Sequence, residues 1–160
     1  MRSKILFLSV LVLITATFWG CGNQSAPKKA FLEFTSAMRE GNWDTVWDML
    51  SEKSQKAFEE EGYKKMKEIL DTMPSDLKKQ KITELGVTNG ELQKMSAKDF
   101  FKLIMKKTDA SKEFMKNAGG DQVEKAQVQE NKARLKIKGK NEVAVMVCEK
   151  GKWKMEFEED

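Results

Sequence analysis

The stretch NKARLKIKGKNEVAVMVCEKGKWKMEF, residues 131–157, predicts three antiparallel strands joined by two tight turns. Apolar and cationic residues alternate over 133–137, which is the two-residue period of a strand with one buried face. The segment 141–148 is apolar on both faces, which is typical of a central strand that is covered on both sides. After turn residues at 149–151, a third alternation runs over 153–157. These strands therefore predict a C-terminal antiparallel sheet.

The chain before this sheet predicts helices, because its apolar residues recur at three- and four-residue intervals. We expect a first helix from Pro27 to a cap at Gly41 and a second from a cap at Asn42 to Leu50. A third is expected from a cap at Ser51 or Ser54 to Pro74, with a weak point at Gly62, and a fourth from Ser75 to Leu85, closed by Gly86. A capping box at Ser96–Asp99 predicts a helix through Phe100–Met105, and Ser111–Ala118 predicts a weaker one. A strand near Lys81–Thr83 stays open as an alternative, and Thr88–Gly90 is expected to form a turn.

A first strand is expected at 122–129, which completes a meander of about four strands. The predicted fold class is therefore α+β, with N-terminal helices packed on a curved C-terminal antiparallel sheet. The helix over 100–105 is expected to lie between the sheet and its neighbours. Helices can cover one face of the central strand. The face that carries Met146 and Cys148 has no evident cover, so we expect a misplaced helix or a partner there.

Composition limits the classes of function. The chain has 160 residues, which suits one domain after removal of an N-terminal segment. Its 29 Lys and Arg residues interleave with 25 Asp and Glu residues, which favours a solvated surface over a nucleic-acid-binding patch. The chain contains no histidine, and its two cysteines are far apart, so we predict neither a metal site nor a cofactor.

The N-terminus has the three parts of a secretory signal. Arg2 and Lys4 supply positive charge, and an apolar run follows over 5–19. As a helix this run would span roughly 22 Å, less than the roughly 30 Å of hydrocarbon in a bilayer. We therefore expect residues 1–20 to be removed, residues 21–27 to form a polar tether and residues 28–160 to form one α+β domain.

The end of this signal resembles a bacterial lipobox, with Gly20 directly before Cys21. The resemblance implies cleavage before Cys21 and lipid attachment (diacylglycerol and usually a further acyl chain such as palmitate) to that residue. The implied location is the bacterial cell envelope, on the periplasmic face of the outer membrane if the source is Gram-negative, because Gly22 is not the aspartate that favours inner-membrane retention. Ordinary signal cleavage, which leaves a free Cys21, is the alternative.

Stretches at both ends of the mature chain resemble small bacterial lipoproteins of the nuclear transport factor 2-like superfamily. Near the N-terminus these are Phe31–Phe34 (FLEF) and Met38–Trp43 (MREGNW). Near the C-terminus they are Asn131–Ile137 (NKARLKI) and Glu149–Met155 (EKGKWKM), which includes the "G-x-W-K" ending. The resemblance implies a curved sheet that helices wrap around a cone-shaped pocket. Enzymes, binding modules and interaction proteins all use this fold, so the fold does not supply an activity.

The residues favour binding over catalysis. Enzymes of that superfamily use a His–Asp pair or an Asp with Tyr donors, whereas this chain has no histidine and its one tyrosine, Tyr63, lies on a charged helix. Without a histidine to activate it, Cys148 is interpreted as a buried structural thiol. The lysine rows on the strands are interpreted as a solvated face that prevents edge pairing, with anionic lipid or peptidoglycan as the alternative.

We therefore predict a non-catalytic envelope lipoprotein that binds a small apolar ligand or an envelope protein, with the membrane as partner through its lipid anchor. The alternative is a small hydrolase- or isomerase-like enzyme acting in the cone. A polar, open pocket that holds an Asp or Glu would favour the enzyme, whereas a pocket plugged by Trp43, Trp47, Phe100 and Trp153 would rule it out. We predict a pocket that is either plugged in this way or purely apolar. The predicted pocket lining is Phe31, Phe34, Trp43, Trp47, Phe100 and Trp153.

Overall fold

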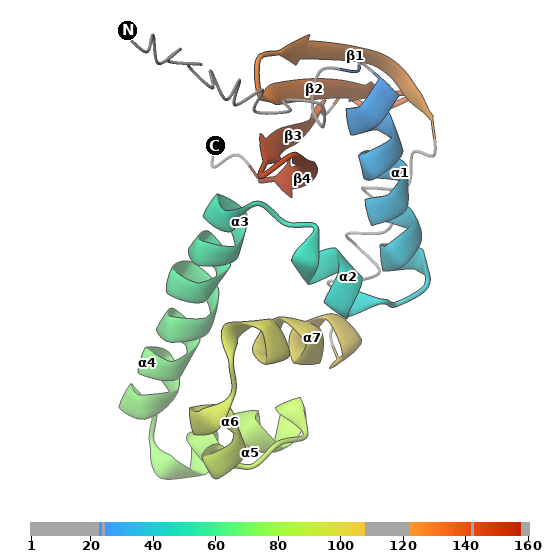
Figure 1. Ribbon diagram of the computed structural model, residues 1–160. Helices are drawn as coiled ribbons and strands as arrows, with labels where there is room; N and C mark the ends of the chain where they lie inside the picture. Colours follow the sequence, from blue (N-terminus) through green and yellow to red (C-terminus); the bar gives the residue numbers. More distant parts are fainter. Residues whose placement is uncertain (1–22, 24, 108–121, 142, 158–160) are drawn as a thin grey trace, which may run out of the picture.

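The computed structural model describes residues 23, 25–107, 122–141 and 143–157. Figure 1 shows the helices first and the sheet at the C-terminal end, so the predicted α+β class is confirmed. No helix within these ranges is long and apolar enough to cross a membrane. The elements are α1 (Ser25–Arg39), α2 (Trp43–Asp48), α3 (Glu52–Ala57), the π-helix η1 (Phe58–Lys64), α4 (Lys65–Thr72), α5 (Ser75–Leu85), α6 (Asn89–Lys94), α7 (Ala97–Lys107), β1 (Val123–Gln129), β2 (Lys132–Ile137), β3 (Val143–Glu149) and β4 (Lys152–Glu156).

The sheet is an antiparallel meander. Among the described residues its order is β1-β2-β3-β4, as the sequence predicts. The turn between β3 and β4 places both Lys150 and Gly151 at positive φ, 52° and 79°. A two-residue turn of this kind matches the right-handed twist of the strands that it joins. The register then pairs Cys148 with Trp153 and Met146 with Met155.

One face of the sheet packs on α1. The buried residues of this cluster are Phe31, Ala133, Leu135, Ile137, Ala144, Met146 and Trp153. The expectation that the Met146 face lacks cover is therefore wrong, because Phe31 of α1 packs on it. The error arose because the apolar stripe of α1 is wide enough to serve two clusters: Phe31 faces the sheet, while Phe34 and Met38 face α2.

The α1–α2 corner forms as the sequence predicts. The backbone of Gly41 has φ 68°, and the N–H groups of Gly41 and Asn42 donate to the carbonyls of Met38 and Ala37 at 3.0 and 2.8 Å. This pattern satisfies carbonyls that the end of α1 would otherwise leave unpaired. Asn42 then caps α2, since its Oδ1 accepts from the N–H of Thr45 at 3.2 Å.

The last strand also pairs with the segment between α2 and α3. The N–H of Ser51 donates to the carbonyl of Met155, and the N–H of Met155 donates to the carbonyl of Met49, both at 2.8 Å. Leu50 and Met155 thus form a short parallel bridge at the outer edge of β4. The bridge attaches the helical part of the chain to the sheet.

The remaining helices form an arm that leads away from the sheet (Figure 1). The α3–η1–α4 run extends over 52–72, and α7 returns to pack against α2, η1 and α5. The expected position of α7 between the sheet and its neighbours is therefore wrong. Its wide apolar surface is used instead by α2 on one side and by the arm on the other.

The arm corrects two further expectations. Residues 75–85 are helical and end at Gly86 with φ 71°, so the strand alternative is wrong. Thr88–Gly90 is not an isolated turn but the start of α6: the Thr88 hydroxyl accepts from the N–H of Glu91 at 3.2 Å, and the Glu91 carboxylate accepts from the N–H of Thr88 at 2.7 Å. This capping box outweighs the turn tendency of Asn89 and Gly90. The helix predicted over 111–118 lies outside the described residues.

Tyr63 holds the inside of the arm together. It is buried in a cluster with Leu70, Ile82, Leu92 and Phe100. Its hydroxyl donates to the carbonyl of Leu92 at 3.1 Å and lies within hydrogen-bonding distance of the carbonyl of Met95. The sequence placed Tyr63 on a charged helix, and the structure turns it inward between the charged residues of η1.

Tyr63→Phe is expected to lower the free energy of unfolding by about 1–3 kcal/mol, because buried carbonyl groups lose their donor. Urea titration followed by circular dichroism measures the change. Thr72→Val is the control, since the exposed Thr72 hydroxyl also donates to a helix carbonyl, that of Ile69 at 2.9 Å. The control should change stability by less than about 0.5 kcal/mol. Equal losses in the two variants would contradict the role assigned to Tyr63.

Candidate functional site

An apolar cavity of about 360 Å³ lies between the helices and the end of the last strand. Its walls come from α1, α2, the α2–α3 connection, α3, η1, α7 and the residue after β4. The lining residues are Phe34, Trp43, Val46, Leu50, Ser54, Ala57, Phe58, Phe101, Met105 and Phe157. It is the strongest candidate for a functional site in the described part of the chain, because ligand pockets are concave and mostly apolar.

Helical spacing produces the walls. Trp43, Val46 and Leu50 follow each other at intervals of three and four residues, so they form one stripe. Phe101 and Met105 of α7 are four residues apart and form a second stripe. About one or two turns of each of these two helices therefore line the cavity.

The cavity wall carries few polar atoms, and those of Ser54 are already hydrogen-bonded within the protein. Ser54 is the one polar side chain among the lining residues, and its Oγ accepts from the N–H of Phe157 at 2.9 Å and bonds Ser51 Oγ at 3.0 Å. The indole Nε1 of Trp43 lies 3.9 Å from where a Cβ on Gly41 would stand, so it faces the α1–α2 corner. The part of any ligand inside the cavity would therefore meet hydrocarbon.

The lining residues differ in burial, which divides the cavity into a buried floor and a more exposed rim. Phe34, Val46 and Phe101 are at most 4 % exposed and belong to the floor. Ala57, Phe58 and Met105 are half-buried, and Phe157 is 40 % exposed. The cavity therefore reaches solvent between η1, the end of α7 and Phe157.

Aromatic contacts fix the Phe58 part of the rim. The ring of Phe58 packs edge to face against the rings of Trp47 and Phe101, with centroid distances of 5.8 and 5.3 Å. Gly62 lies next to the same ring, and a Cβ added there would be in van der Waals contact with it at 3.4 Å. The predicted weak point at Gly62 thus coincides with the π-helix η1, a helix type that occurs often at functional sites.

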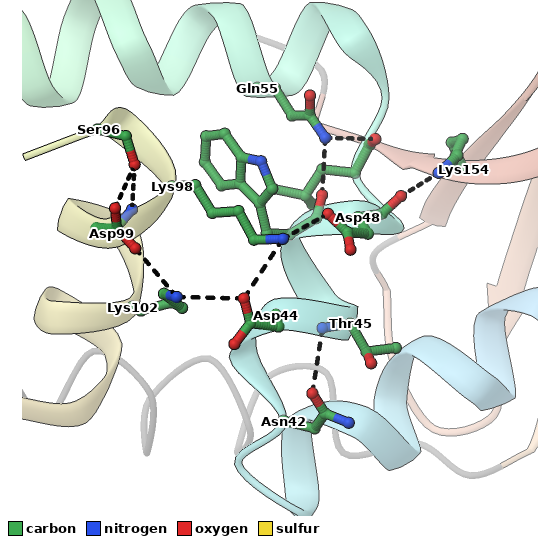
Figure 2. A network of polar contacts seen from close by, with 12 residues as sticks. Asn42, Asp44, Thr45, Asp48, Gln55, Ser96, Lys98, Asp99, Lys102 and Lys154 are labelled. Atoms are coloured by element: carbon green, nitrogen blue, oxygen red, sulfur yellow. Dashed lines mark hydrogen bonds and ion pairs between the residues drawn. The ribbon is translucent and has the colours of Figure 1, made fainter.

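Lysines and carboxylates join the two helices whose stripes face each other across the cavity. Figure 2 shows Asp44 and Asp48 of α2 beside Lys98 and Lys102 of α7. Lys98 Nζ lies 2.8 Å from Asp48 Oδ1, and Lys102 Nζ lies 3.2 Å from Asp44 Oδ1 and 3.1 Å from Asp99 Oδ1. These ion pairs hold α2 and α7 at their spacing from outside the cavity.

The ion pairs shift the pKa values of their members. The hydrogen bond from Lys102, followed by that from Lys98, lowers the pKa of Asp44 below its usual 3.8. The hydrogen bond to Asp48 raises the pKa of Lys98, and the bonds to Asp99 and Asp44 raise that of Lys102. Both lysines and Asp44 are therefore charged at neutral pH.

The structure separates the six predicted lining residues. Phe34 and Trp43 line the cavity, and Trp47 packs behind its wall in the same cluster. Phe31 and Trp153 belong to the sheet cluster, while Phe100 belongs to the cluster of the arm. The expected plug of Trp43, Trp47, Phe100 and Trp153 therefore does not assemble.

Several lining residues were missed by the sequence reasoning, above all Phe58 and Phe157. Phe58 stands at helical spacing, which signals burial but not which cluster it joins. Phe157 continues the alternation of Trp153 and Met155, so the pattern placed it on the sheet face. The strand ends one residue earlier, at Glu156, and the N–H of Phe157 bonds Ser54 instead.

The structure describes one of the two cysteines. Cys21 lies outside the described residues. Cys148 is half-buried and takes part in a disulfide bond, so its interpretation as a buried free thiol is wrong. No group of His, Cys, Asp and Glu in the described ranges could hold a metal ion.

Comparison with known proteins gives no relative: no family model, curated protein or solved structure matches the chain.

The Asp44–Lys102 pair is expected to couple α2 to α7 in a pH-dependent way. A double-mutant cycle of Asp44→Asn and Lys102→Met should show favourable coupling at pH 7 in thermal unfolding. Because folding lowers the pKa of Asp44, this coupling is present above the unfolded pKa, near 3.8, and is lost as the pH falls below that value. High salt should also reduce it, since the pair is exposed. A coupling that stays constant from pH 7 to pH 2.5 would contradict this assignment.

Proposed function

We propose that this protein is a membrane-anchored envelope lipoprotein that acts as a non-catalytic binding module for a small apolar ligand. The cavity is the observation that carries the proposal. None of its ten lining residues is titratable, and its one polar side chain is already hydrogen-bonded. A hydrolase- or isomerase-like enzyme would need an acid or base at this place, so the lining favours binding.

The anchor part of the proposal is carried by the sequence. A positive n-region, an apolar segment and Gly20–Cys21 stand immediately before the folded domain. Helix α1 begins at Ser25, where Asn23 Oδ1 accepts from the Ser25 N–H at 3.0 Å. Residues 25–27 thus belong to the domain rather than to the tether. The four residues from Cys21 to Ser25 can span at most about 14 Å, so a lipid on Cys21 would hold α1 close to the membrane surface.

The nuclear transport factor 2-like fold stays a proposal within this assignment. The MREGNW corner after α1 and the G-x-W-K turn before β4 support it. The binding function does not depend on it, because the lining includes no residue of β1–β4. The location on the outer-membrane periplasmic face, in a Gram-negative source, likewise rests on the sequence around Cys21.

The disulfide bond of Cys148 provides a direct alternative to the lipid anchor. The chain has two cysteines, and a thioether to diacylglycerol consumes the sulfur of Cys21. A sulfur that carries diacylglycerol cannot also form a disulfide bond. Lipidation and an intrachain disulfide exclude each other, so one measurement distinguishes them.

Mass spectrometry of the full chain, expressed in a bacterial host and isolated from membranes, is expected to find diacylglycerol on Cys21 at the new N-terminus. Cys21→Ser should abolish both cleavage and lipid addition. The proposed anchor is contradicted by an unmodified Cys21 disulfide-bonded to Cys148.

The cavity is expected to bind a compact apolar probe. In membranes that contain the full chain, a small phenyl diazirine should label Val46, Phe58 or Phe101 on irradiation, as located by peptide mass spectrometry. Ala57→Trp should reduce this labelling at least tenfold, because Ala57 lies on the rim and an indole there fills the opening. Lys56→Trp is the matched control, since Lys56 is the exposed neighbouring residue on the same helix. Equal labelling in both variants would contradict a binding cavity.

A further inference from the structure

We propose that the ligand of the cavity is a single linear acyl chain, inserted with its methyl end toward Phe34, Val46 and Phe101 and with its polar head outside at Phe157. This inference rests on the proposed binding function and names the chemical class of ligand. It follows from the size of the cavity, the chemistry of its walls and the position of its opening.

The size of the cavity fits a chain better than a single ring. At about 360 Å³ it has more than twice the volume of an engineered apolar cavity of roughly 150 Å³ that stays dry and binds benzene. Counting roughly 30 Å³ for each group the size of a water molecule or methylene, it holds about a dozen such groups. A medium-length hydrocarbon tail occupies this volume.

The walls require that the inserted part carry no polar group. Ser54 Oγ is occupied by the Phe157 N–H and Ser51, and the other lining side chains are aromatic, aliphatic or thioether, with the Trp43 nitrogen turned toward Gly41. A ligand hydroxyl or carboxylate on the floor would lose its water without gaining a partner, which is unfavourable. Polycyclic or peptide ligands with internal polar groups are therefore disfavoured.

The opening lies on one side, so one end of the ligand stays in water. The less buried lining residues are Ala57, Phe58, Met105 and Phe157, whereas the floor residues are buried, so we place the opening at these four residues. An amphiphile satisfies both environments, with its tail on the floor and its head beyond the rim.

The charges next to the rim do not select a head group. Lys56 and Lys106 adjoin the rim residues Ala57 and Met105, but Glu59 and Glu156 adjoin Phe58 and Phe157. The sequence neighbours of the rim residues thus include both signs of charge, and two of them are paired elsewhere, Glu59 with Lys64 and Glu156 with Lys132. The linear acyl chain that the cavity would recognise occurs in a free fatty acid, in a lysophospholipid and in each tail of a bilayer phospholipid. The experiment below distinguishes these three sources.

The test uses photoreactive lipids in membranes that contain the full chain. A diazirine near the methyl end of a twelve- to sixteen-carbon fatty acid (on the order of the dozen groups counted above) should label Phe34, Val46 or Phe101. The same group placed beside the carboxylate should label Ala57 or Phe157. Lysophosphatidylcholine and two-chain phosphatidylcholine with the same labelled tail form the other arms, and the arm that labels the floor most strongly identifies the source.

Ala57→Trp should reduce floor labelling at least tenfold, whereas Lys56→Trp should leave it within twofold of the wild type. Circular dichroism and thermal unfolding establish that both variants are folded. If Ala57→Trp does not fold, Met105→Trp with Lys106→Trp as control gives the same comparison on α7.

Two outcomes overturn the inference. One is floor labelling by the phenyl diazirine but by none of the acyl probes, which leaves the proposed binding function standing and removes only the acyl chain. The other is labelling by acyl probes that is spread over the surface and insensitive to Ala57→Trp. If neither the phenyl nor the acyl probes reach the floor, both the inference and the proposed function fail.

Discussion

The backbone bridge between Leu50 and Met155 is the interaction on which the rest of the structure depends. Its two 2.8 Å hydrogen bonds join the segment after α2 to the outer edge of β4. The bond from the Phe157 N–H to Ser54 extends the junction by one more residue. Together they place α3 beside the end of the sheet and protect an edge strand that would otherwise be open to pairing.

The two sides of the bridge differ in packing. On the sheet side, α1 closes a face on which Ala133, Leu135 and Met146 are fully buried, with almost no exposed surface. On the helical side, α2, η1 and α7 meet through large aromatic rings at edge-to-face angles, and the cavity lies among these helices. The salt bridges between α2 and α7 lie outside that space and fix its width without placing charge in it.

Much of the fold could be predicted from local patterns. The alternation over 131–157 gave the strands and their turns, because the period of side chains along a strand is fixed by backbone geometry. Gly41, Asn42, Ser51 and Gly86 marked helix ends correctly, since each cap depends on a few neighbouring residues. The candidate site was predicted only in part: Phe34 and Trp43 line the cavity, whereas Phe31, Phe100 and Trp153 serve other clusters.

The sequence by itself determined the class of fold, the four strands and several of the helix ends. The tertiary structure decided which apolar residues share a cluster. Phe100 and Phe101 illustrate the difference: they are adjacent and equally buried, yet about 100° of helix rotation sends one into the arm and the other into the cavity wall. Periodicity shows that a side chain is buried, but the partner across the interface comes from chain segments far away in the sequence. The cavity depends on those long-range positions, so the sequence pattern could not reveal it.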